Sequence, residues 1–237
     1  MKQRKSKKIR NPYHSIVPLE AKTDNQKDYI RSIIENDVTL CSGPSGCGKS
    51  FIAAGVAAHH LYKDLIEQVI VTRPLICTGK DIGSLPGELN EKIAPYLLPM
   101  QENFKYFLNH SYHRLHNREH KINYKPLEIM RGSTFHNSYM ILDEAQNCTY
   151  DQIKMFISRM GHNSKVLING DTDQTDLKRN SGLSVCMDKL YDIEEVAICK
   201  LNYSDIQRNG IIGKILHALE NKKWNILMNS MSKKKTQ

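Results

Sequence analysis

Long apolar runs are missing from this sequence. The longest stretch, residues 52–58, contains a glycine and falls far short of the ~20 residues that a membrane-spanning helix needs. The N-terminus is charged and no apolar segment follows it, so we expect no secretory signal there. We therefore expect a protein of the cytoplasm that makes no use of a membrane.

Paired cysteines and a high content of glycine and proline are also missing. The six cysteines are scattered, with no CxxC pair and no spacing typical of a zinc site, and we expect reduced thiols. Thirteen glycines and eight prolines are too few for a fibrous or low-complexity chain. The 237 residues are 40% hydrophobic, which suffices to bury a core, and the length fits one domain of roughly 200 residues between flexible ends.

An excess of positive charge is absent outside the two ends. Residues 1–10 hold six basic side chains and no acid, and residues 233–235 are three lysines. Without these nine, 25 basic and 25 acidic side chains balance. We predict a flexible basic arm (1–20), one domain (21–222) and a short basic tail (223–237). Such ends attach to phosphate polymers through their general field, or serve only as solubilising ends.

Short β-branched runs alternate with helical patterns along the domain. Strands are predicted at 37–42, 69–72, 127–130, 139–142, 165–169 and 196–200, and helices at 23–36, 50–63, 103–121, 150–160 and 211–221. Residues 75–101, which include Pro95 and Pro99, are predicted to form a long loop with short helical pieces. Alternation of nearly all-apolar strands with helices predicts an α/β fold, with a parallel sheet covered on both faces.

Residues 43–50 match the phosphate-loop pattern G-x-x-x-x-G-K-[ST] at every defined position, between an apolar strand and a helix. The glycines let backbone N–H groups turn toward phosphate oxygens, and the helix N-terminus adds positive charge. Lys49 would reach the β- and γ-phosphates, and Ser50 would ligate Mg²⁺. The predicted ATP-binding residues of this loop are Gly43, Pro44, Ser45, Gly46, Cys47, Gly48, Lys49 and Ser50.

Two acids follow the strand predicted at 139–142. Ligands of open α/β sheets bind at the carboxyl ends of the strands, where these acids would lie. Asp143 would hold Mg²⁺ together with Ser50, and Glu144 would orient and activate the attacking water. The pair predicts hydrolysis of ATP rather than binding alone.

A second acidic turn follows the strand predicted at 165–169, in the order Gly170-Asp171-Thr172-Asp173-Gln174. If this strand is parallel and adjacent to the 139–142 strand, Gln174 lies beside the γ-phosphate. Its amide would sense whether that phosphate is present and relay the change to the next loop. We therefore add Gln174 to the predicted catalytic group.

These motifs, in this order, resemble the PhoH family, whose ATPases are related to the first motor domain of superfamily 1 helicases. The resemblance covers residues 20–220 and includes Thr72-Arg73-Pro74, the loop around Leu85-Pro86-Gly87 and the DEAQN run that begins at Asp143. It implies a RecA-like P-loop NTPase of a single domain. It also implies an ATPase that uses Mg²⁺, acts on RNA and assembles as a ring-shaped homo-oligomer such as a hexamer.

The resemblance marks four further residues. Arg208 lies at the family's arginine position and would stabilise transition-state charge, either in cis or from a neighbouring subunit. Gln26 lies where related motors carry a glutamine that bonds adenine, although a helix-surface glutamine fits nearly as well. Arg73 lies where these motors contact a nucleic-acid backbone, with Arg131 as a second candidate. A packing or interface role is the alternative for both arginines.

Residues 105–131 carry six Lys/Arg and four histidines: His110, His113, His116 and His120. Their spacing puts the histidines along one helix face. A solvated face, a surface for single-stranded nucleic acid and a metal site are the three interpretations. The lack of tight pairs with cysteine or carboxylate partners disfavours the metal.

The leading hypothesis is a Mg²⁺-dependent ATPase coupled to single-stranded RNA or DNA, including an RNA helicase. A nucleotide-dependent switch or chaperone-like oligomer that acts on a protein partner is the alternative. A nucleotide kinase is disfavoured, because the acidic motifs favour attack by water rather than by an acceptor hydroxyl.

Overall fold

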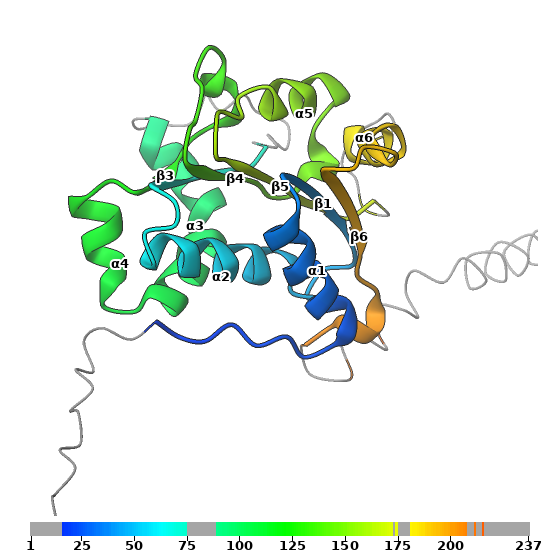
Figure 1. Ribbon diagram of the computed structural model, residues 1–237, viewed down its shortest axis with the longest axis horizontal. Helices are drawn as coiled ribbons and strands as arrows, with labels where there is room; N and C mark the ends of the chain where they lie inside the picture. The colour runs from blue at the N-terminus through cyan, green and yellow to red at the C-terminus, as the bar shows by residue number, and fades with distance from the viewer. Residues whose placement is uncertain are drawn as a thin grey trace, which may run out of the picture.

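The structure, a computed structural model, describes residues 16–74, 89–172, 174, 181–207, 211 and 215, with the side chains of 89–94 excepted. In this part of the chain six strands form one sheet in the order β3-β2-β4-β5-β1-β6, and every neighbouring pair is parallel (Figure 1). The predicted α/β class with a parallel sheet is therefore confirmed. Among the described residues, none of the helices combines the length and apolarity needed to span a bilayer.

The elements follow one another as strand and helix along most of the chain. The strands are β1 (Val38–Ser42), β2 (Gln68–Thr72), β3 (Ile122–Tyr124), β4 (Ser138–Leu142), β5 (Lys165–Gly170) and β6 (Val196–Lys200). The α-helices are α1 (Asp24–Glu35), α2 (Lys49–Tyr62), α3 (Leu89–Leu108), α4 (Ser111–His113), α5 (Tyr150–Ile157) and α6 (Gly182–Leu190). Short turns of other helix types are η3 (Arg114–Arg118), η4 (Leu127–Met130), η5 (Ala145–Asn147) and η6 (Tyr203–Asp205).

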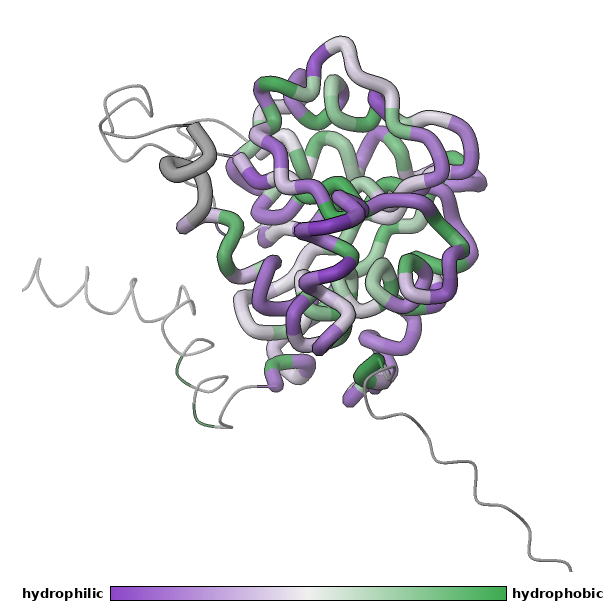
Figure 2. Tube along the Cα trace, turned by 90° about the vertical axis from the view of Figure 1, so that its left-hand side faces the viewer, coloured by the Kyte–Doolittle hydropathy of each residue, from purple (hydrophilic) through white to green (hydrophobic). Residues whose placement is uncertain are grey.

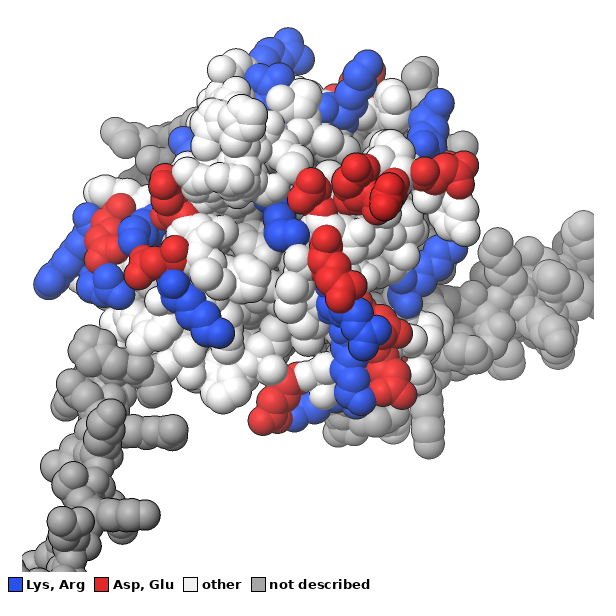
Figure 3. All heavy atoms as spheres, in the orientation of Figure 1, with Lys and Arg blue, Asp and Glu red and all other residues white. Residues whose placement is uncertain are grey.

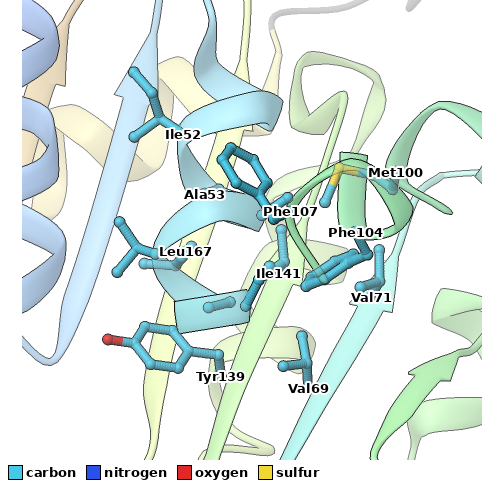
Figure 4. Packing of buried hydrophobic residues seen from close by; sticks show 14 of the residues in the cluster. Ile52, Ala53, Val69, Val71, Met100, Phe104, Phe107, Tyr139, Ile141 and Leu167 are labelled. Atoms are coloured by element: carbon cyan, nitrogen blue, oxygen red, sulfur yellow. The ribbon is translucent and has the colours of Figure 1, made fainter. Parts of the chain in front are cut away.

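Helices cover both faces of the sheet, with α1, α2 and α3 on one side and α5 and α6 on the other (Figure 1). Alternate residues of each strand face opposite layers. Val69, Ile141 and Leu167 pack against α2 and α3 (Figure 4), whereas Ile70 and Met140 belong to the core under α5 and α6. Figure 2 shows the hydrophobic segments running through the middle of the domain.

The chain packs against the domain from the first described residues onward. The Val17 N–H donates to Phe107 O at 2.9 Å, and His59 Nε2 lies 2.9 Å from Val17 O. Gly55 of α2 makes this close approach possible, since a Cβ there would lie 2.8 Å from Phe107 Cζ and 2.9 Å from a Leu19 methyl. Residues 16–20 thus belong to the packed domain, ahead of the predicted start at residue 21.

One predicted strand, at residues 127–130, is wrong. This segment forms the 3₁₀ turn η4, while the edge strand β3 is Ile122–Tyr124, close to the predicted helix over 103–121. Leu127 and Met130 are buried and Ile129 is exposed, and this spacing of three is typical of a 3₁₀ turn. An apolar run of four residues does not distinguish the two structures.

The loop predicted over residues 75–101 is also wrong where the structure describes it, because α3 continues through Pro95 and Pro99. An interior proline removes a helical hydrogen bond and costs about 3 kcal/mol. Burial of α3 side chains against α2 offsets this cost, and the buried ones recur at helical spacing: Leu97, Met100, Phe104, Phe107 and Leu108. Helix α6 was not predicted, and the helix predicted at 211–221 lies mostly outside the described residues.

Candidate functional site

A cavity of about 710 Å³ opens at the carboxyl ends of the strands. Its size is typical of small-molecule sites. It brings together most of the predicted site residues that the structure describes, namely Gln26, Ser45, Gly46, Gly48, Lys49, Ser50, Arg73, Asp143, Glu144 and Gln174. Gly43, Pro44 and Cys47 belong to the same loop without lining the cavity, Arg131 lies elsewhere, and Arg208 is outside the described residues.

The phosphate loop connects the end of β1 to the first residue of α2. Gly46 (φ 86°) and Gly48 (φ 97°) adopt left-handed backbone conformations, which only glycine adopts without strain. Gly43 is needed for space instead, since a Cβ there would lie 2.6 Å from Leu201 O. The loop thus ends at a helix N-terminus, whose free N–H groups and dipole favour phosphate.

Lys49 folds back over the loop. Its Nζ donates to Gly43 O at 2.5 Å and to Pro44 O at 3.0 Å. The ammonium group is therefore held at the mouth of the loop, where it can exchange carbonyl oxygens for phosphate oxygens of higher charge.

Ser50, in the first turn of α2, and Asp143, directly after β4, meet at the cavity. The Ser50 hydroxyl donates to Asp143 Oδ1 at 2.6 Å, and Asp143 is buried. Burial, and then the charge of Glu144, raise the pKa of Asp143, while the Ser50 hydrogen bond, Arg73 and Lys49 oppose that rise. One carboxylate and one hydroxyl beside a phosphate loop are the hard-oxygen donors that suit Mg²⁺, which keeps several waters and phosphate oxygens as its other ligands. The donor set therefore fits this ion.

Glu144 lies beside Asp143 in a different environment. Its backbone is left-handed (φ 57°), and its carboxylate is partly exposed at the cavity. Arg73 Nη2 lies 3.0 Å from Glu144 Oε1, and Gln146 Nε2 donates to Glu144 Oε2 at 2.6 Å. A strained backbone that is fixed by side-chain contacts is typical of functional sites.

Gln146 connects the two acidic motifs and was not among the predicted site residues. It is buried, and its Oε1 accepts the Asp171 N–H at 3.1 Å. Through Gln146, a change at the Asp171 turn can reach the Glu144 carboxylate. The DEAQ run contained this residue, but nothing in the sequence showed which two groups its amide would join.

The Asp171 turn lies next to the Asp143 strand, because β5 pairs with β4 as expected. The Gln174 N–H donates to Asp171 O at 3.2 Å, and the hydroxyls of Thr172 and Ser42 are 2.9 Å apart. Gln174 is exposed at the cavity, and this turn attaches it to both β5 and the end of β1.

Gln26 is buried rather than free on the helix surface. Its Nε2 donates to Cys47 O at 2.9 Å and to Asp205 O at 3.3 Å, and its Oε1 accepts the Lys22 N–H at 2.8 Å. The same amide lines the cavity beside Gly48. A base-binding role for Gln26 remains a proposal.

The segment that leads toward residue 208 docks on the phosphate loop. Asp205 is fully buried and accepts hydrogen bonds from the Thr23 hydroxyl at 2.5 Å and the Asn25 amide at 3.0 Å. The Gln207 N–H donates to Gly46 O at 3.3 Å. The contacts of Asp205 with Thr23 and Asn25 span about 180 residues of sequence, so no local pattern could have predicted them.

Comparison with known proteins identifies the family. A family model described as PhoH-like protein matches residues 18–220. The chain belongs to the PhoH-like protein family. It is 40% identical over 204 residues to a PhoH-like protein of Synechocystis, covering 85% of this chain and 62% of the relative. It is 38% identical over 205 residues to Protein PhoH of Escherichia coli K12, covering 85% of this chain and 58% of that one. The chain thus spans about three fifths of the length of these PhoH relatives.

Solved structures with a similar backbone include two bacteriophage proteins. The large terminase of a thermophilic bacteriophage matches with a TM-score of 0.52 at 13% identity, covering 82% of this chain and 49% of the terminase. The UvsW helicase of bacteriophage T4 matches with a TM-score of 0.50 at 17% identity, covering 79% and 64%. At these identities the likeness shows the fold, which is the predicted RecA-like P-loop NTPase. Family and fold together support a P-loop ATPase.

Proposed function

We propose that this PhoH-like protein is a Mg²⁺-dependent ATP hydrolase of the cytoplasm, coupled to single-stranded RNA or DNA and active as a homo-oligomer. The observation that carries the proposal is the arrangement of Lys49, Ser50, Asp143 and Glu144 around one cavity at the carboxyl ends of the strands. A phosphate loop alone would bind a nucleotide. The two acids beside it supply the groups that hydrolysis needs.

Each group has one role in this proposal. The loop N–H groups and Lys49 bind the phosphates, and Ser50 and Asp143 hold Mg²⁺, which when bound neutralises phosphate charge. Glu144 takes a proton from water, the water oxygen bonds to the γ-phosphorus, and the bond from that phosphorus to the bridging oxygen breaks. The products are ADP and phosphate. Gln174 would sense the γ-phosphate, and Gln26 the adenine.

The nucleic-acid part of the proposal rests on charge. Lysine and arginine are interleaved with aspartate and glutamate on the face shown in Figure 3, in agreement with the balanced charge of residues 11–232. The excess charge lies in residues 1–10 and 233–235 and would hold phosphate backbones without sequence preference. Arg73 and Arg131 are the proposed contacts within the domain, and Arg208 is proposed to act across a subunit interface of a ring such as a hexamer.

ATP hydrolysis measured with and without single-stranded RNA or DNA tests the proposal, with Lys49→Ala and Glu144→Gln as negative controls. We expect release of phosphate that depends on Mg²⁺ and that a single-stranded polymer accelerates. Any unwinding of RNA should depend on this hydrolysis. Hydrolysis that no polymer changes would favour a switch acting on a protein partner instead. Transfer of phosphate to an acceptor hydroxyl would favour a kinase.

A further inference from the structure

The Glu144 carboxylate carries a donor on each oxygen. The two donors come from different parts of the chain: Gln146 lies two residues away in η5, and Arg73 follows the end of β2. They also differ in how firmly they are held. Gln146 is buried and is fixed on its other side by the Asp171 N–H, whereas the Arg73 side chain keeps a quarter of its surface exposed.

Arg73 has a second partner, on α3. Its Nη1 donates to Tyr96 O at 3.2 Å. This carbonyl lies in the turn before Pro99, and Pro99 lacks the N–H that would bond to Pro95 O, so the helix is locally weakened there. Pro99 also lines the cavity. Arg73 therefore links the proposed base to a weakened turn of the helix at the rim of the site.

We propose that Arg73 is a positioning residue that restrains Glu144 in a resting arrangement, and that a phosphate of a nucleic-acid backbone releases Glu144 by taking the Arg73 guanidinium. This inference rests on the proposed ATPase function and names its regulation. A guanidinium binds phosphate as well as carboxylate, through the same fork of N–H donors. An ion pair between partly exposed groups is weak enough for a second anion to compete.

Release of Arg73 changes one oxygen and leaves the other in place. Glu144 lines the cavity, and without Arg73 its Oε1 has no donor and can accept a proton from the attacking water. Oε2 keeps the buried Gln146 amide, so the carboxylate does not swing away. The left-handed backbone at residue 144 fixes the direction in which the side chain leaves the strand. Binding of a nucleic-acid strand is thereby coupled to the Glu144 carboxylate without any contact between the nucleic acid and ATP.

The test compares kcat and KM for ATP in the wild type, Arg73→Ala and Arg73→Lys, each with and without single-stranded RNA. Arg31→Ala is the matched control, because it removes an exposed ion pair to Asp28 on α1, away from the cavity. Thermal melting of each variant checks that it folds.

Without RNA, we expect Arg73→Ala to have a kcat about fivefold above the wild type, the ratio that a partly exposed ion pair sustains, with KM unchanged. RNA should no longer accelerate this variant. Arg73→Lys keeps the charge and should return the basal rate toward that of the wild type, and Arg31→Ala should match the wild type in both conditions.

If the wild type hydrolyses ATP and the basal kcat of Arg73→Ala is equal to or below that of the wild type, the inference is overturned and the proposed ATPase function is not. Equality at saturating ATP would mean that the nucleotide's own phosphate opens the pair, and a lower kcat that Arg73 assists the reaction. If neither protein hydrolyses ATP with or without RNA, the proposed function fails, and the inference fails with it.

Discussion

The two sides of the nucleotide cavity are built in different ways. On the side of β1, Lys49 folds back over the phosphate loop and bonds to carbonyl groups five and six residues away. On the side of β4, the contacts come from side chains distant in sequence: Ser50 with Asp143, and Arg73 with Glu144. Lys49, which would bind phosphate, is thus held by neighbours in the sequence, whereas the acids that would carry out the reaction contact residues that the fold brings together.

The largest effect is expected from breaking the local side. Lys49→Ala removes a charged donor from the phosphates, which should weaken ATP binding about 10- to 100-fold and remove hydrolysis. Lys27→Ala is the matched control, since Lys27 pairs with Asp24 on the exposed face of α1. Titration with a fluorescent ATP analogue measures the affinity of both variants for the nucleotide. Equal affinity in Lys49→Ala and Lys27→Ala would contradict the assigned role.

On the other side, Gln146→Ala should lower kcat about tenfold and leave KM for ATP unchanged, because it removes one hydrogen bond from a charged group without touching the phosphate loop. Gln146→Glu should lower kcat further, since it places a second negative charge next to Glu144. Steady-state kinetics measure both variants. A raised KM with normal kcat would mean that Gln146 serves binding instead.

The stability of the folded protein should depend on pH through Asp143, on the β4 side of the cavity. Burial raises the pKa of Asp143, so the folded state binds its proton more tightly than the unfolded state does. Stability therefore falls as pH rises from the unfolded value, about 4, through the higher folded value. The side chain of Asp143→Asn cannot ionise. The free energy of unfolding of this variant, relative to that of the wild type, should therefore rise with pH across this range by on the order of 1 kcal/mol.

Urea denaturation without Mg²⁺ or nucleotide, from pH 4 to pH 8, measures this difference between Asp143→Asn and the wild type. A difference that stays constant with pH, or that shrinks as pH rises, would show that the buried carboxylate is not destabilised by its surroundings.

The smallest effect on hydrolysis is expected from the charged ends. Deletion of residues 1–10 and 233–237 should weaken binding to single-stranded RNA about tenfold at low salt and flatten its salt dependence, because fewer counterions are released. Basal hydrolysis should stay the same. Filter binding over a salt series, beside an ATPase assay, tests this, and a loss of basal activity would place the ends within the working domain.

The difference between the two sides also explains what could be predicted from the sequence. Glycine spacing in the phosphate loop is a local requirement, so the loop, its strand and its helix were predicted correctly. The two acidic turns were correctly predicted to lie at the carboxyl ends of the strands, because the parallel strands β4 and β5 both end there. The contact of Gln146 with Asp171 and that of Asp205 with Thr23 could not be predicted, because they join residues far apart in the sequence. The course of α3 through Pro95 and Pro99 depends on burial against α2, which a proline signal does not report.

The most direct test of the division into a binding side and a reacting side is Glu144→Gln, with ATP affinity and single-turnover hydrolysis measured on the same protein. Glutamine keeps the shape of the side chain but cannot take a proton from water. We predict wild-type affinity for ATP and hydrolysis slowed about 10²- to 10⁴-fold. Hydrolysis at the wild-type rate, or a loss of ATP binding equal to that of Lys49→Ala, would contradict this prediction.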